Sequence, residues 1–397
     1  MAGPLSHIRI LDLSRIMAGP WAGQILADLG AEVIKVERAG VGDDTRRWGP
    51  PFLKDSEGQD TAESGYYLSV NRGKKSIEVD LSSPEGQQII RDLAVESDIV
   101  LENFKVGTLD RYGLGAEQLR ALNPELIYCS ITGFGQDGPK AEDAAYDFMI
   151  QAMGGLMSVT GVPEGEAGAG PQKVGIPIID IMTGMYAAVS VLAALANRQH
   201  QNKGEQIDIA MLDVATAILS NQAMNYLVSD KVPERKGNKH PNIQPQDVFP
   251  VKDGHIVIAV GNDEQFSRFA TALNQAEWGT DPHYATNVAR VKNLDTLHPL
   301  ICDALQQQNL QHWLDALNSL KIPCAPINTI PRTLDEPQIK HREMLQHIQH
   351  PLAGTVPQIV SPMKFKESSL VFDRAPPLLG QHTDQVLAAL EKRKQKR

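Results

Sequence analysis

Short apolar runs and helical patterns alternate along the first half of the chain. Segments such as 21–29 and 84–96 have the spacing of amphipathic helices, and five apolar runs predict buried strands near residues 8–13, 32–36, 75–79, 98–101 and 126–131. Strands that alternate with helices in this way are typical of a mostly parallel sheet with helices on both faces. The pattern therefore predicts an α/β fold for this half.

The second half begins with a long apolar helix. Residues 181–196 carry no charge, which predicts a helix buried between other elements, and a strand at 206–210 and a helix at 212–228 follow. Residues 229–245 are polar and contain several Pro, Asn and Lys, as in an extended linker. Beyond them we expect a smaller α+β unit, with strands near 248 and 255–260 and helices near 263–273 and 287–307, and then a last helix at the chain end.

Composition narrows the class of protein. The chain has 397 residues, of which 42% are hydrophobic and 22% charged, so a soluble protein of two or three domains is expected. Its formal charge of −10 disfavours nucleic acid as a partner. The first residues show no signal-peptide pattern, and no uncharged apolar run reaches the roughly 18 residues of a membrane span. We therefore expect a cytoplasmic protein without a membrane segment.

The three cysteines are scattered along the chain. Cys129, Cys302 and Cys324 form no CxxC pair and no spacing typical of metal ligands. This pattern argues against a disulfide framework and against structural zinc. We therefore expect a reducing compartment and no metal site.

Asp180 occupies a position that could serve catalysis. It lies between a segment marked by Gly175 and Pro177 and the uncharged run at 181–196. A carboxylate at the mouth of a helix faces backbone N–H groups and the positive end of the dipole, which favour its ionised form. The same groups can stabilise charge on a reacting carbonyl. The alternative, and the commoner role of Asp at a helix start, is an N-cap.

Cations cluster near the ends of two predicted strands. Arg38 follows the second strand, and three cations open the next one: Arg72, Lys74 and Lys75. Such groups can hold phosphates by charge-assisted hydrogen bonds, or they can form a solvated rim. A dinucleotide site is disfavoured, because the first strand–helix turn lacks GxGxxG and carries the bulky Met17 and Trp21.

Two further segments contain candidate binding residues. The loop at 40–51 is rich in Gly and Pro and holds Arg46 and Arg47, which could bind a substrate carboxylate or pair with Asp43 or Asp44 at the surface. Farther along, Tyr146 and Asp147 stand at a predicted helix start, where capping is the default role.

Several motifs together resemble one family, the class III coenzyme A transferases (CaiB/BaiF). The resemblance covers essentially the whole chain and rests on the segments 11–20, 29–38, 42–46, 71–77, 102–104, 175–184 and 378–383. Within the family, segments 43–52 and 69–77 are most similar to those of the succinyl-CoA:glutarate-type dicarboxylate transferases.

The resemblance implies a particular architecture. A large Rossmann-like domain is expected from residues 1–228 and 327–397, joined by the linker 229–245 to a small domain at 246–326. It also implies a homodimer of two ring-like subunits threaded through each other.

The resemblance also assigns roles to residues. Asp180 matches the family's nucleophile. The expected CoA-binding residues are Arg38, Arg72, Lys74, Lys75, Asn103, Phe104 and Arg111. The expected substrate-binding residues are Met17, Arg46, Arg47, Trp48, Tyr146, Asp147, Gly261 and Asn262. Oxalate/formate members have a glutamine near the position of Met17, so that substrate pair is disfavoured.

The implied activity is transfer of CoA from an acyl-CoA, with succinyl-CoA as the expected donor, to a small carboxylic acid, with a dicarboxylate as the expected acceptor. Asp180 would form an anhydride and then a CoA thioester. Acyl-CoA would be a substrate, and no tightly bound cofactor is expected. An acyl-CoA racemase is one alternative, disfavoured because Tyr146 stands where racemases have a histidine and is a poor base near neutral pH. A non-catalytic acyl-CoA-binding protein is the other.

Overall fold

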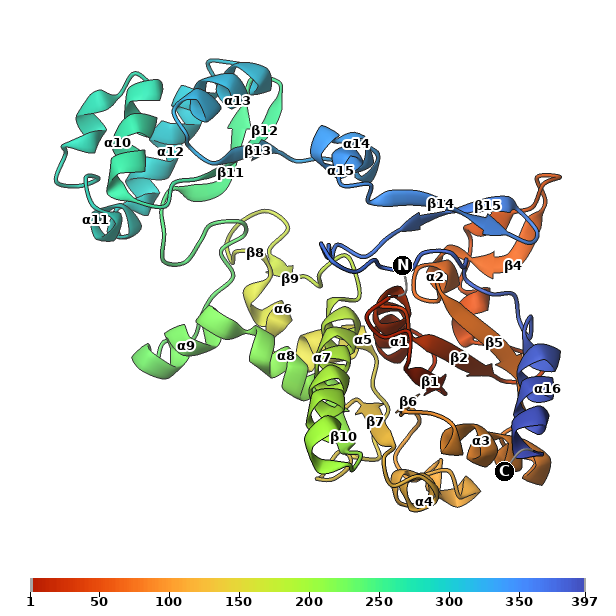
Figure 1. Cartoon of the computed structure of the whole chain (residues 1–397). Helices are drawn as coiled ribbons and strands as arrows, with labels where there is room; N and C mark the ends of the chain where they lie inside the picture. Colours follow the sequence, from red (N-terminus) through yellow and green to blue (C-terminus); the bar gives the residue numbers. More distant parts are fainter. Residues whose placement is uncertain (1–2, 396–397) are drawn as a thin grey trace. The chain divides into compact units, whose positions relative to one another are not determined.

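The computed structural model describes residues 3–395, and the contacts within it divide the chain into two compact units (Figure 1). The first unit consists of residues 3–156, 173–227 and 337–395, and the second of residues 157–172 and 228–336. The second unit thus differs from the expected small domain at 246–326. It includes the expected linker, extends to Glu336 and adds a short segment from the middle of the chain.

The first unit is organised around a six-stranded parallel sheet, as the sequence predicts. Its strands, in spatial order, are β10 (Gln206–Ala210), β7 (Ile127–Thr132), β6 (Ile99–Glu102), β1 (Arg9–Asp12), β2 (Glu32–Glu37) and β5 (Lys74–Glu78). From β1 the chain adds β2 and β5 on one side, and then β6, β7 and β10 on the other. This is the order of a doubly wound Rossmann sheet, so all six carboxyl ends meet at one edge.

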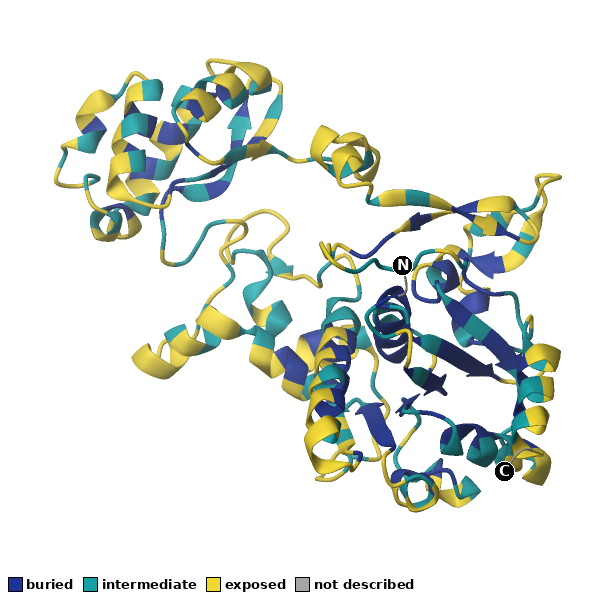
Figure 2. Ribbon diagram, in the orientation of Figure 1, coloured by how far each residue is buried: buried dark blue, intermediate teal, exposed yellow. Residues whose placement is uncertain are grey.

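Helices cover both faces of this sheet. Ile10 packs on the face covered by α1 and α7, whereas its neighbour Leu11 packs on the opposite face, covered by α3, α4 and α16. Both side chains are fully buried, which explains why the strands are continuous apolar runs without alternation (Figure 2). The helices of the first unit are α1 (Ala18–Asp28), α2 (Gly65–Leu68), α3 (Pro84–Val95), α4 (Ala116–Leu122), α5 (Asp147–Met153), α7 (Ile178–Gln201), α8 (Met211–Ile218), α15 (Pro337–His341) and α16 (Thr383–Lys394).

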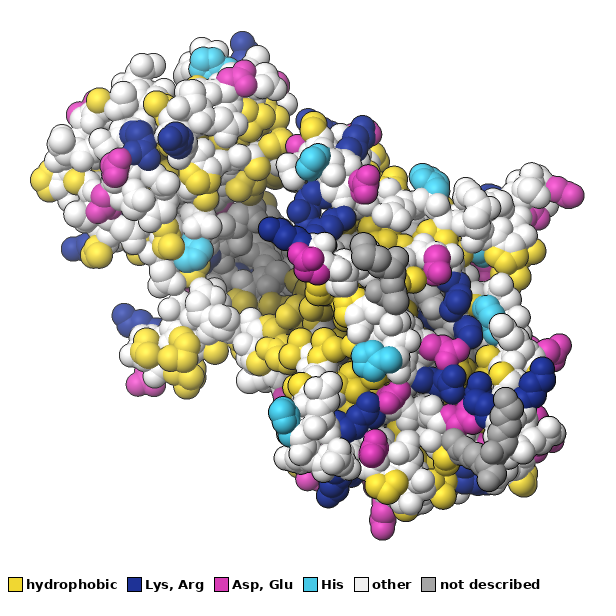
Figure 3. Space-filling view, in the orientation of Figure 1, with side chains coloured by type: hydrophobic (Ala, Val, Ile, Leu, Met, Phe, Trp, Pro, Cys, Tyr) yellow, Lys and Arg dark blue, Asp and Glu magenta, His cyan; other side chains and the backbone are white. Residues whose placement is uncertain are grey.

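The long helix α7 is only half covered. Ala187 and Val191 are buried against α1 and the sheet, whereas Met185, Tyr186 and Val189 are each more than 40% exposed. By length and composition α7 could cross a membrane, and within the described residues it is the one helix that could; its packing on the sheet accounts for its apolar inner face. The sequence predicts a helix buried between other elements, and in the single chain only one face of α7 is covered. Figure 3 shows apolar side chains gathered over this part of the molecule.

Two predicted helices are each broken into two. The helix expected at 212–228 is split into α8 and α9 (Ser220–Ser229), because Ser220, at the junction, has a φ of 46°, which lies outside the right-handed helical region and interrupts the helix. The helix expected at 287–307 becomes α11 (Asn287–Lys292) and α12 (Leu294–Leu305). Two antiparallel hairpins were not predicted: β3 (Phe52–Lys54) with β4 (Asp60–Ser64), and β14 (Leu345–His350) with β15 (Gly354–Ile359).

The second unit is an α+β structure with its own core. Its antiparallel sheet packs against helices through a cluster that includes Phe249, Phe269, Leu297 and Trp313. The strands are β11 (Gln246–Val251), β12 (Gly254–Ala259) and β13 (Cys324–Pro326), beside the separate pair β8 (Gly161–Val162) and β9 (Gly170–Pro171). The remaining helices are α10 (Asp263–Ala272), α13 (Leu310–Ser319) and α14 (Ile330–Asp335), and α6 (Leu156–Val159) begins at the last residue of the first unit.

Candidate active site

The candidate site lies at the carboxyl edge of the six-stranded sheet, where β1 and β6 are neighbours. The strand order reverses at this pair, and in such sheets ligands bind in the crevice outside the two strand ends. Two cavities lie there, and both are lined by Arg15 and Phe104, which follow β1 and β6. The guanidinium carbon of Arg15 is 5.3 Å from the centroid of the Phe104 ring. The two cavities are therefore adjacent.

We name the cavities by the residue that distinguishes each. The Asp180 cavity has a volume of about 190 Å³, and the predicted site residues among its lining are Met17, Asn103, Phe104, Tyr146 and Asp180. The Arg38 cavity has a volume of about 470 Å³, and its lining includes Arg38, the segment 79–82 after β5, Thr108 and Tyr112. The structure thus brings together residues from strand ends that are far apart in the sequence.

The start of α7 is capped by another helix. Asp147, the first residue of α5, accepts hydrogen bonds through Oδ1 from the backbone N–H of Ile179, at 2.7 Å, and of Asp180, at 3.1 Å. Gln151 donates through Nε2 to the other carboxylate oxygen of Asp147 at 2.6 Å. Asp180 is the third residue of α7, and Pro177 stands at the N-cap position. The N-cap alternative for Asp180 is therefore wrong, and Asp147 caps α7 instead of its own helix.

This capping changes the charge state of Asp180. Burial, together with the nearby negative charge of Asp147, raises the pKa of the Asp180 carboxyl to about 7. The sequence-based expectation was the opposite, namely that helix N–H groups keep Asp180 ionised. It is wrong because the N–H groups of Ile179 and Asp180 bond to Asp147. Near neutral pH the carboxyl is consequently about half protonated.

Tyr66 is a site residue that sequence reasoning missed. It lies on α2, half-buried, with its ring edge-on to Trp48 at 5.0 Å between centroids. Burial raises the pKa of Tyr66 to about 12, and the charges of Asp180 and Asp147 contribute to that rise. Tyr66 is thus close to both carboxylates and keeps its phenolic proton. No spacing in the sequence points to it, because α2 approaches the site only in the folded chain.

A buried ion pair holds the turn between β1 and α1. Ile16 in this turn has a φ of 72°, a strained conformation for a β-branched residue. Its N–H donates to both oxygens of Asp43 at 3.3 Å, and Asp43 pairs with Lys35 at 2.8 Å. The Asp43 and Lys35 side chains are fully buried. The pair therefore fixes the turn that places Met17 in the Asp180 cavity.

Asn103 connects the two strand ends at the site. Its side-chain oxygen accepts from the N–H of Arg15 at 2.8 Å, and its side-chain nitrogen donates to the carbonyl oxygen of Arg15 at 2.7 Å. Arg15 and Lys105 directly follow β1 and β6, line the Asp180 cavity and were not predicted as site residues. Arg111 is exposed on the turn that carries Tyr112, but it lines neither cavity.

The cations before β5 are structural. Arg72 pairs with Asp28 at 2.7 Å and Lys74 with Asp12 at 2.9 Å, all with side chains at most 3% exposed. Lys75 pairs with Glu32 at 2.6 Å. Because parallel strands run in one direction, the amino end of β5 lies at the edge opposite the cavities. The assignment of Arg72, Lys74 and Lys75 to CoA binding is therefore wrong, and the carboxyl end of β5 contributes residues 79–82 instead.

Arg46 is also structural. Its guanidinium donates to Glu37 at 2.7 and 2.8 Å and to Glu63 at 2.7 Å, and it further contacts Tyr67 Oη and the Pro377 carbonyl oxygen. Arg46 is 4% exposed, so it has no free donor for a substrate carboxylate, and that assignment is wrong.

The neighbours of Arg46 remain available to a ligand. Arg47 and Trp48 are exposed. The alternative in which Arg47 pairs with Asp43 or Asp44 is not realised, because Asp43 pairs with Lys35 and Asp44 pairs with Arg15.

Gly261 and Asn262 belong to the second unit. Asn262 caps α10 by accepting from the N–H of Gln265 at 2.8 Å, and the N–H of Gly261 donates to the Gln265 side chain at 2.8 Å. Their part in substrate binding stays a prediction. Within residues 3–395, no three His, Cys, Asp or Glu side chains are grouped so that they could hold a metal ion.

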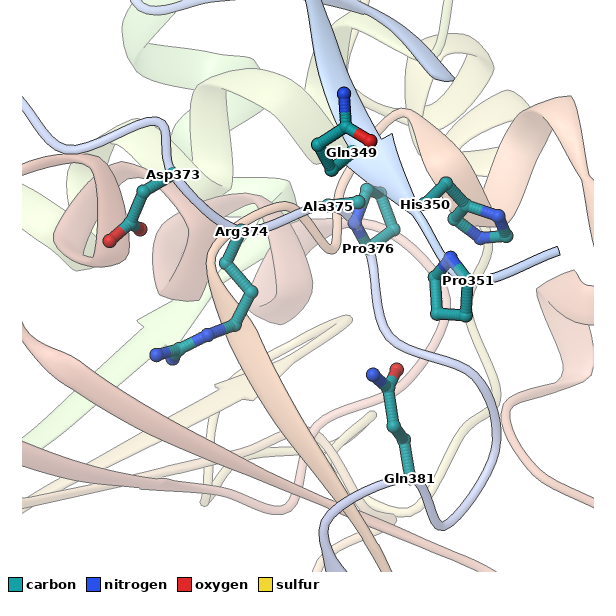
Figure 4. Close-up of a pocket in the computed structure, with 8 residues that line it drawn as sticks. All are labelled: Gln349, His350, Pro351, Asp373, Arg374, Ala375, Pro376 and Gln381. Carbon is teal, nitrogen blue, oxygen red and sulfur yellow. The ribbon is translucent and has the colours of Figure 1, made fainter. Parts of the chain in front are cut away.

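A third cavity, of about 320 Å³, lies at the opposite edge of the sheet. Figure 4 shows its lining residues, which come from the end of β14 and from the segment before α16, and include His350, Arg374 and Gln381. The Arg374 carbonyl oxygen accepts from the N–H of Gly73, just before β5. This cavity is thus beside the amino end of β5, away from Asp180, and we do not assign it to the active site.

Comparison with known proteins identifies the class to which this fold and site belong. The model of CoA-transferase family III matches residues 5–383. The chain is 45% identical over 388 residues to succinate–glutarate CoA-transferase of Agrobacterium fabrum, covering 98% of this chain and 96% of that protein. It is 40% identical over 384 residues to human succinyl-CoA:glutarate CoA-transferase, covering 97% of this chain and 85% of the human protein.

A solved structure agrees with these matches. The crystal structure of a CaiB/BaiF family protein from Brucella suis has a TM-score of 0.87 and 45% identity, covering 98% of this chain and all of that one. The chain therefore belongs to CoA-transferase family III, and it is an enzyme of that family.

The raised pKa of Asp180 predicts a pH-dependent effect of Asp180→Asn on stability. A carboxyl that titrates near 7 in the folded state and near 3.8 in the unfolded state lowers the folding stability progressively as pH rises from about 3.8 to 7, because the unfolded chain releases the proton first, and the loss is complete above about pH 7. The neutral variant should therefore gain stability relative to the wild type as pH rises from 5 to 8, by about 1–3 kcal/mol. Urea denaturation at both pH values measures this difference.

Asp147→Asn serves as the companion variant. It removes the charge that raises the pKa of Asp180 but keeps an oxygen that can accept from Ile179 and Asp180, so the difference between pH 5 and pH 8 should shrink. An Asp180→Asn effect of equal size at both pH values would contradict the raised pKa.

Proposed function

We propose that this enzyme transfers CoA from succinyl-CoA to a free dicarboxylic acid, with Asp180 as the nucleophile. The observation that carries the proposal is the Asp180 carboxyl in a small cavity adjacent to the larger Arg38 cavity at the switch point of the sheet. Relatives named succinyl-CoA:glutarate or succinate–glutarate CoA-transferases, at 40–45% identity, support the substrate class.

The Arg38 cavity suits the nucleotide end of coenzyme A. Arg38 is exposed at its rim and can bind phosphate by charge-assisted hydrogen bonds. Phe104 and Tyr112 provide aromatic surface for an adenine ring. A pantetheine chain that starts there would pass Arg15 and Phe104, which line both cavities, and would bring the thioester to Asp180. Acyl-CoA enters this scheme as a substrate and not as a bound cofactor.

The Asp180 cavity also supplies groups for a second carboxylate. Arg15 and Lys105 line it and are exposed enough to meet a ligand. Because Arg46 has no free donor, we assign the distal carboxylate of the dicarboxylic acid to Arg15 and Lys105. Met17 and Tyr146 form the apolar part of the wall and would set the chain length that fits.

The chemistry proceeds in balanced steps. Ionised Asp180 attacks the thioester carbonyl of the donor, the carbon–sulfur bond breaks, and an anhydride and CoA thiolate form. The thiolate then attacks the aspartyl carbonyl, which releases the donor acid and leaves a thioester between Asp180 and CoA. The acceptor carboxylate reverses these two steps and departs as the new acyl-CoA, leaving Asp180 free.

The surroundings of Asp180 support this chemistry. Burial that raises its pKa also strips water from the carboxylate, so its ionised form is more reactive and the anhydride is shielded from hydrolysis. Tyr66 keeps its proton and can donate a hydrogen bond to an oxygen that gains negative charge. Asp147 fixes the helix start and so the direction of the Asp180 side chain.

A racemase is the second candidate function, but the residues that line the Asp180 cavity support it less well. Racemisation needs two proton-transfer groups on opposite sides of an α-carbon. No histidine lines the Asp180 cavity among the described residues, and Tyr146, where a base would be needed, is 62% exposed.

We also propose that two copies associate as an interlocked dimer in the cytoplasm. The exposed faces of the adjacent helices α5 and α7 support association, since Phe148, Met153, Tyr186 and Val189 are each more than 40% exposed. The three cysteines, which form no disulfide in the structure, agree with a reducing compartment.

The nucleophile is tested by trapping its intermediate. Incubation with succinyl-CoA should add the mass of CoA to the peptide that carries Asp180, because the thioester accumulates when no acceptor is present. Peptide mass spectrometry measures the adduct, and Asp180→Asn, which cannot form it, is the control. A wild-type protein without adduct that exchanges the α-proton of an acyl-CoA in heavy water would instead establish the racemase.

The CoA site is tested by comparing two arginines. Arg38→Ala should raise KM for succinyl-CoA about 10-fold and leave kcat unchanged, because it removes a phosphate contact of about 1.5 kcal/mol or more. Arg72→Ala should instead lower the unfolding free energy by about 3–5 kcal/mol, because it leaves Asp28 buried without its partner. Steady-state kinetics and urea denaturation separate the two effects. Unchanged stability together with raised KM in Arg72→Ala would show that Arg72 binds CoA after all.

The dimer is tested by sedimentation velocity. At micromolar concentration the protein should sediment with twice the chain mass of 43.4 kDa. Val189→Asp should lower the fraction of chains that assemble into dimers as they fold, because it adds a charge to the exposed face of α7. A wild-type protein that sediments as a monomer at about 10 µM would refute the dimer, since an interlocked pair of chains does not dissociate on dilution to this range.

A further inference from the structure

The second unit contains a thiol, an imidazole and a carboxylate that contact one another in a row. Cys302 and His298 lie one turn apart on α12, and Asp247 lies on β11, the strand on which α12 packs (Figure 1). The sulfur of Cys302 is 3.7 Å from Nδ1 of His298, and Nε2 of His298 is 2.9 Å from Oδ2 of Asp247. None of these residues belongs to the transferase site in the first unit.

The hydrogen bonds determine the role of each ring nitrogen. An ionised carboxylate only accepts, so Nε2 of His298 carries the hydrogen that is donated to Asp247. In the neutral ring Nδ1 then has a free lone pair, and it faces the thiol. This is the arrangement in which histidine takes a proton from a nucleophile while a third group orients it.

The neighbours hold His298 in place. Asp247 is 6% exposed, and its Oδ1 accepts from the N–H of Val248 at 2.7 Å, so its carboxylate cannot rotate freely. The ring of Phe249 lies 5.3 Å from the His298 ring, with 30° between the planes. Phe249 is fully buried, and His298 is therefore confined between the strand and its own helix.

We propose that Cys302 is a reactive thiol, activated by His298 and Asp247, and a site of reversible modification by low-molecular-weight disulfides. His298 Nδ1 takes the proton of the thiol, and the sulfur attacks one sulfur of the disulfide. The disulfide bond breaks, and the departing thiolate takes the proton from His298 and leaves as a free thiol. Cys302 is thereby oxidised to a mixed disulfide, and half of the reagent is reduced.

The charges around Cys302 make the base necessary. Burial raises the pKa of the Cys302 thiol, the carboxylates of Asp247 and Asp303 raise it further, and Lys239 opposes them. The resting sulfur is therefore protonated at neutral pH, and His298 must remove the proton during the attack. A thiol of equal exposure without a base would react slowly.

The chain provides its own control thiols. Cys324 is half-buried like Cys302, burial also raises its pKa, and its sulfur contacts the side-chain oxygen of Asn318 at 3.8 Å instead of a base. Cys129 is fully buried in the core of the first unit. Differences between Cys302 and Cys324 thus report the contribution of the histidine.

The experiment measures the rate of each thiol in the full-length protein with 5,5′-dithiobis(2-nitrobenzoate), using Cys302→Ser and Cys324→Ser for assignment. At pH 7 Cys302 should react at least about 10-fold faster than Cys324, because general base catalysis contributes at least that much. His298→Gln, which keeps a donor for Asp247 but lacks the base, should remove this advantage, and Asp247→Asn should reduce it. In the His298 and Asp247 variants the rate of Cys324 should stay constant, which shows that the unit is folded.

The pH dependence gives a second readout. Between pH 6 and 8 the rate of Cys324 should rise about 10-fold per pH unit, because only the thiolate attacks, whereas the rate of Cys302 should rise less steeply, because His298 removes the proton during the attack. Oxidised glutathione should add its mass to the Cys302 peptide, and a reductant should remove it. The proposal is overturned if Cys324 is the faster thiol, if His298→Gln or Asp247→Asn reacts at the wild-type rate, or if both thiols share one pH profile.

Discussion

The bond between Asp147 and the start of α7 sets the chemistry of the site. One carboxylate oxygen accepts from two consecutive backbone N–H groups, so α5 caps a helix that begins more than 30 residues later. Two consequences follow from this one interaction. Asp180 is held at the first turn of a rigid, 24-residue helix, and it is deprived of the N–H groups that would otherwise keep it ionised. Burial and the charge of the capping Asp147 together raise the pKa of Asp180 to about 7.

Beneath this site the sheet carries a layer of buried charge. Lys35 with Asp43, Lys74 with Asp12, and Arg46 with Glu37 and Glu63 all lie under the strand ends, with side chains at most 4% exposed. Ion pairs of this kind add little net stability compared with apolar packing, but each is costly to break. Their contribution here is geometric, since they hold the strained turn at Ile16.

Much of the fold could be predicted from the sequence, because the apolar runs and their order determine a parallel sheet. Asp180 was also predicted as a candidate from its place before an uncharged helix, and it lines a cavity at the carboxyl edge of the sheet. The roles of Arg46 and Asp147 could not be predicted, because they depend on Glu63, Ile179 and other partners that only folding brings near. Arg72 and Lys74 were misassigned for a simpler reason. Arg72 precedes β5 and Lys74 is its first residue, so strand direction alone would have excluded both and favoured Arg15 and Lys105.

Asn103 links two loops of the candidate site. Since it bonds to both the N–H and the carbonyl of Arg15, the loops after β1 and β6 form one frame around both cavities. Because of this frame, the shape of one cavity can change without a change in the other. Exchanging Met17 or Tyr146 alters the wall of the Asp180 cavity, while the lining of the Arg38 cavity, which includes neither residue, stays the same. Under the proposed function, a scaffold with this division can accept new acid substrates through single side-chain replacements, while the residues proposed to hold coenzyme A remain unchanged.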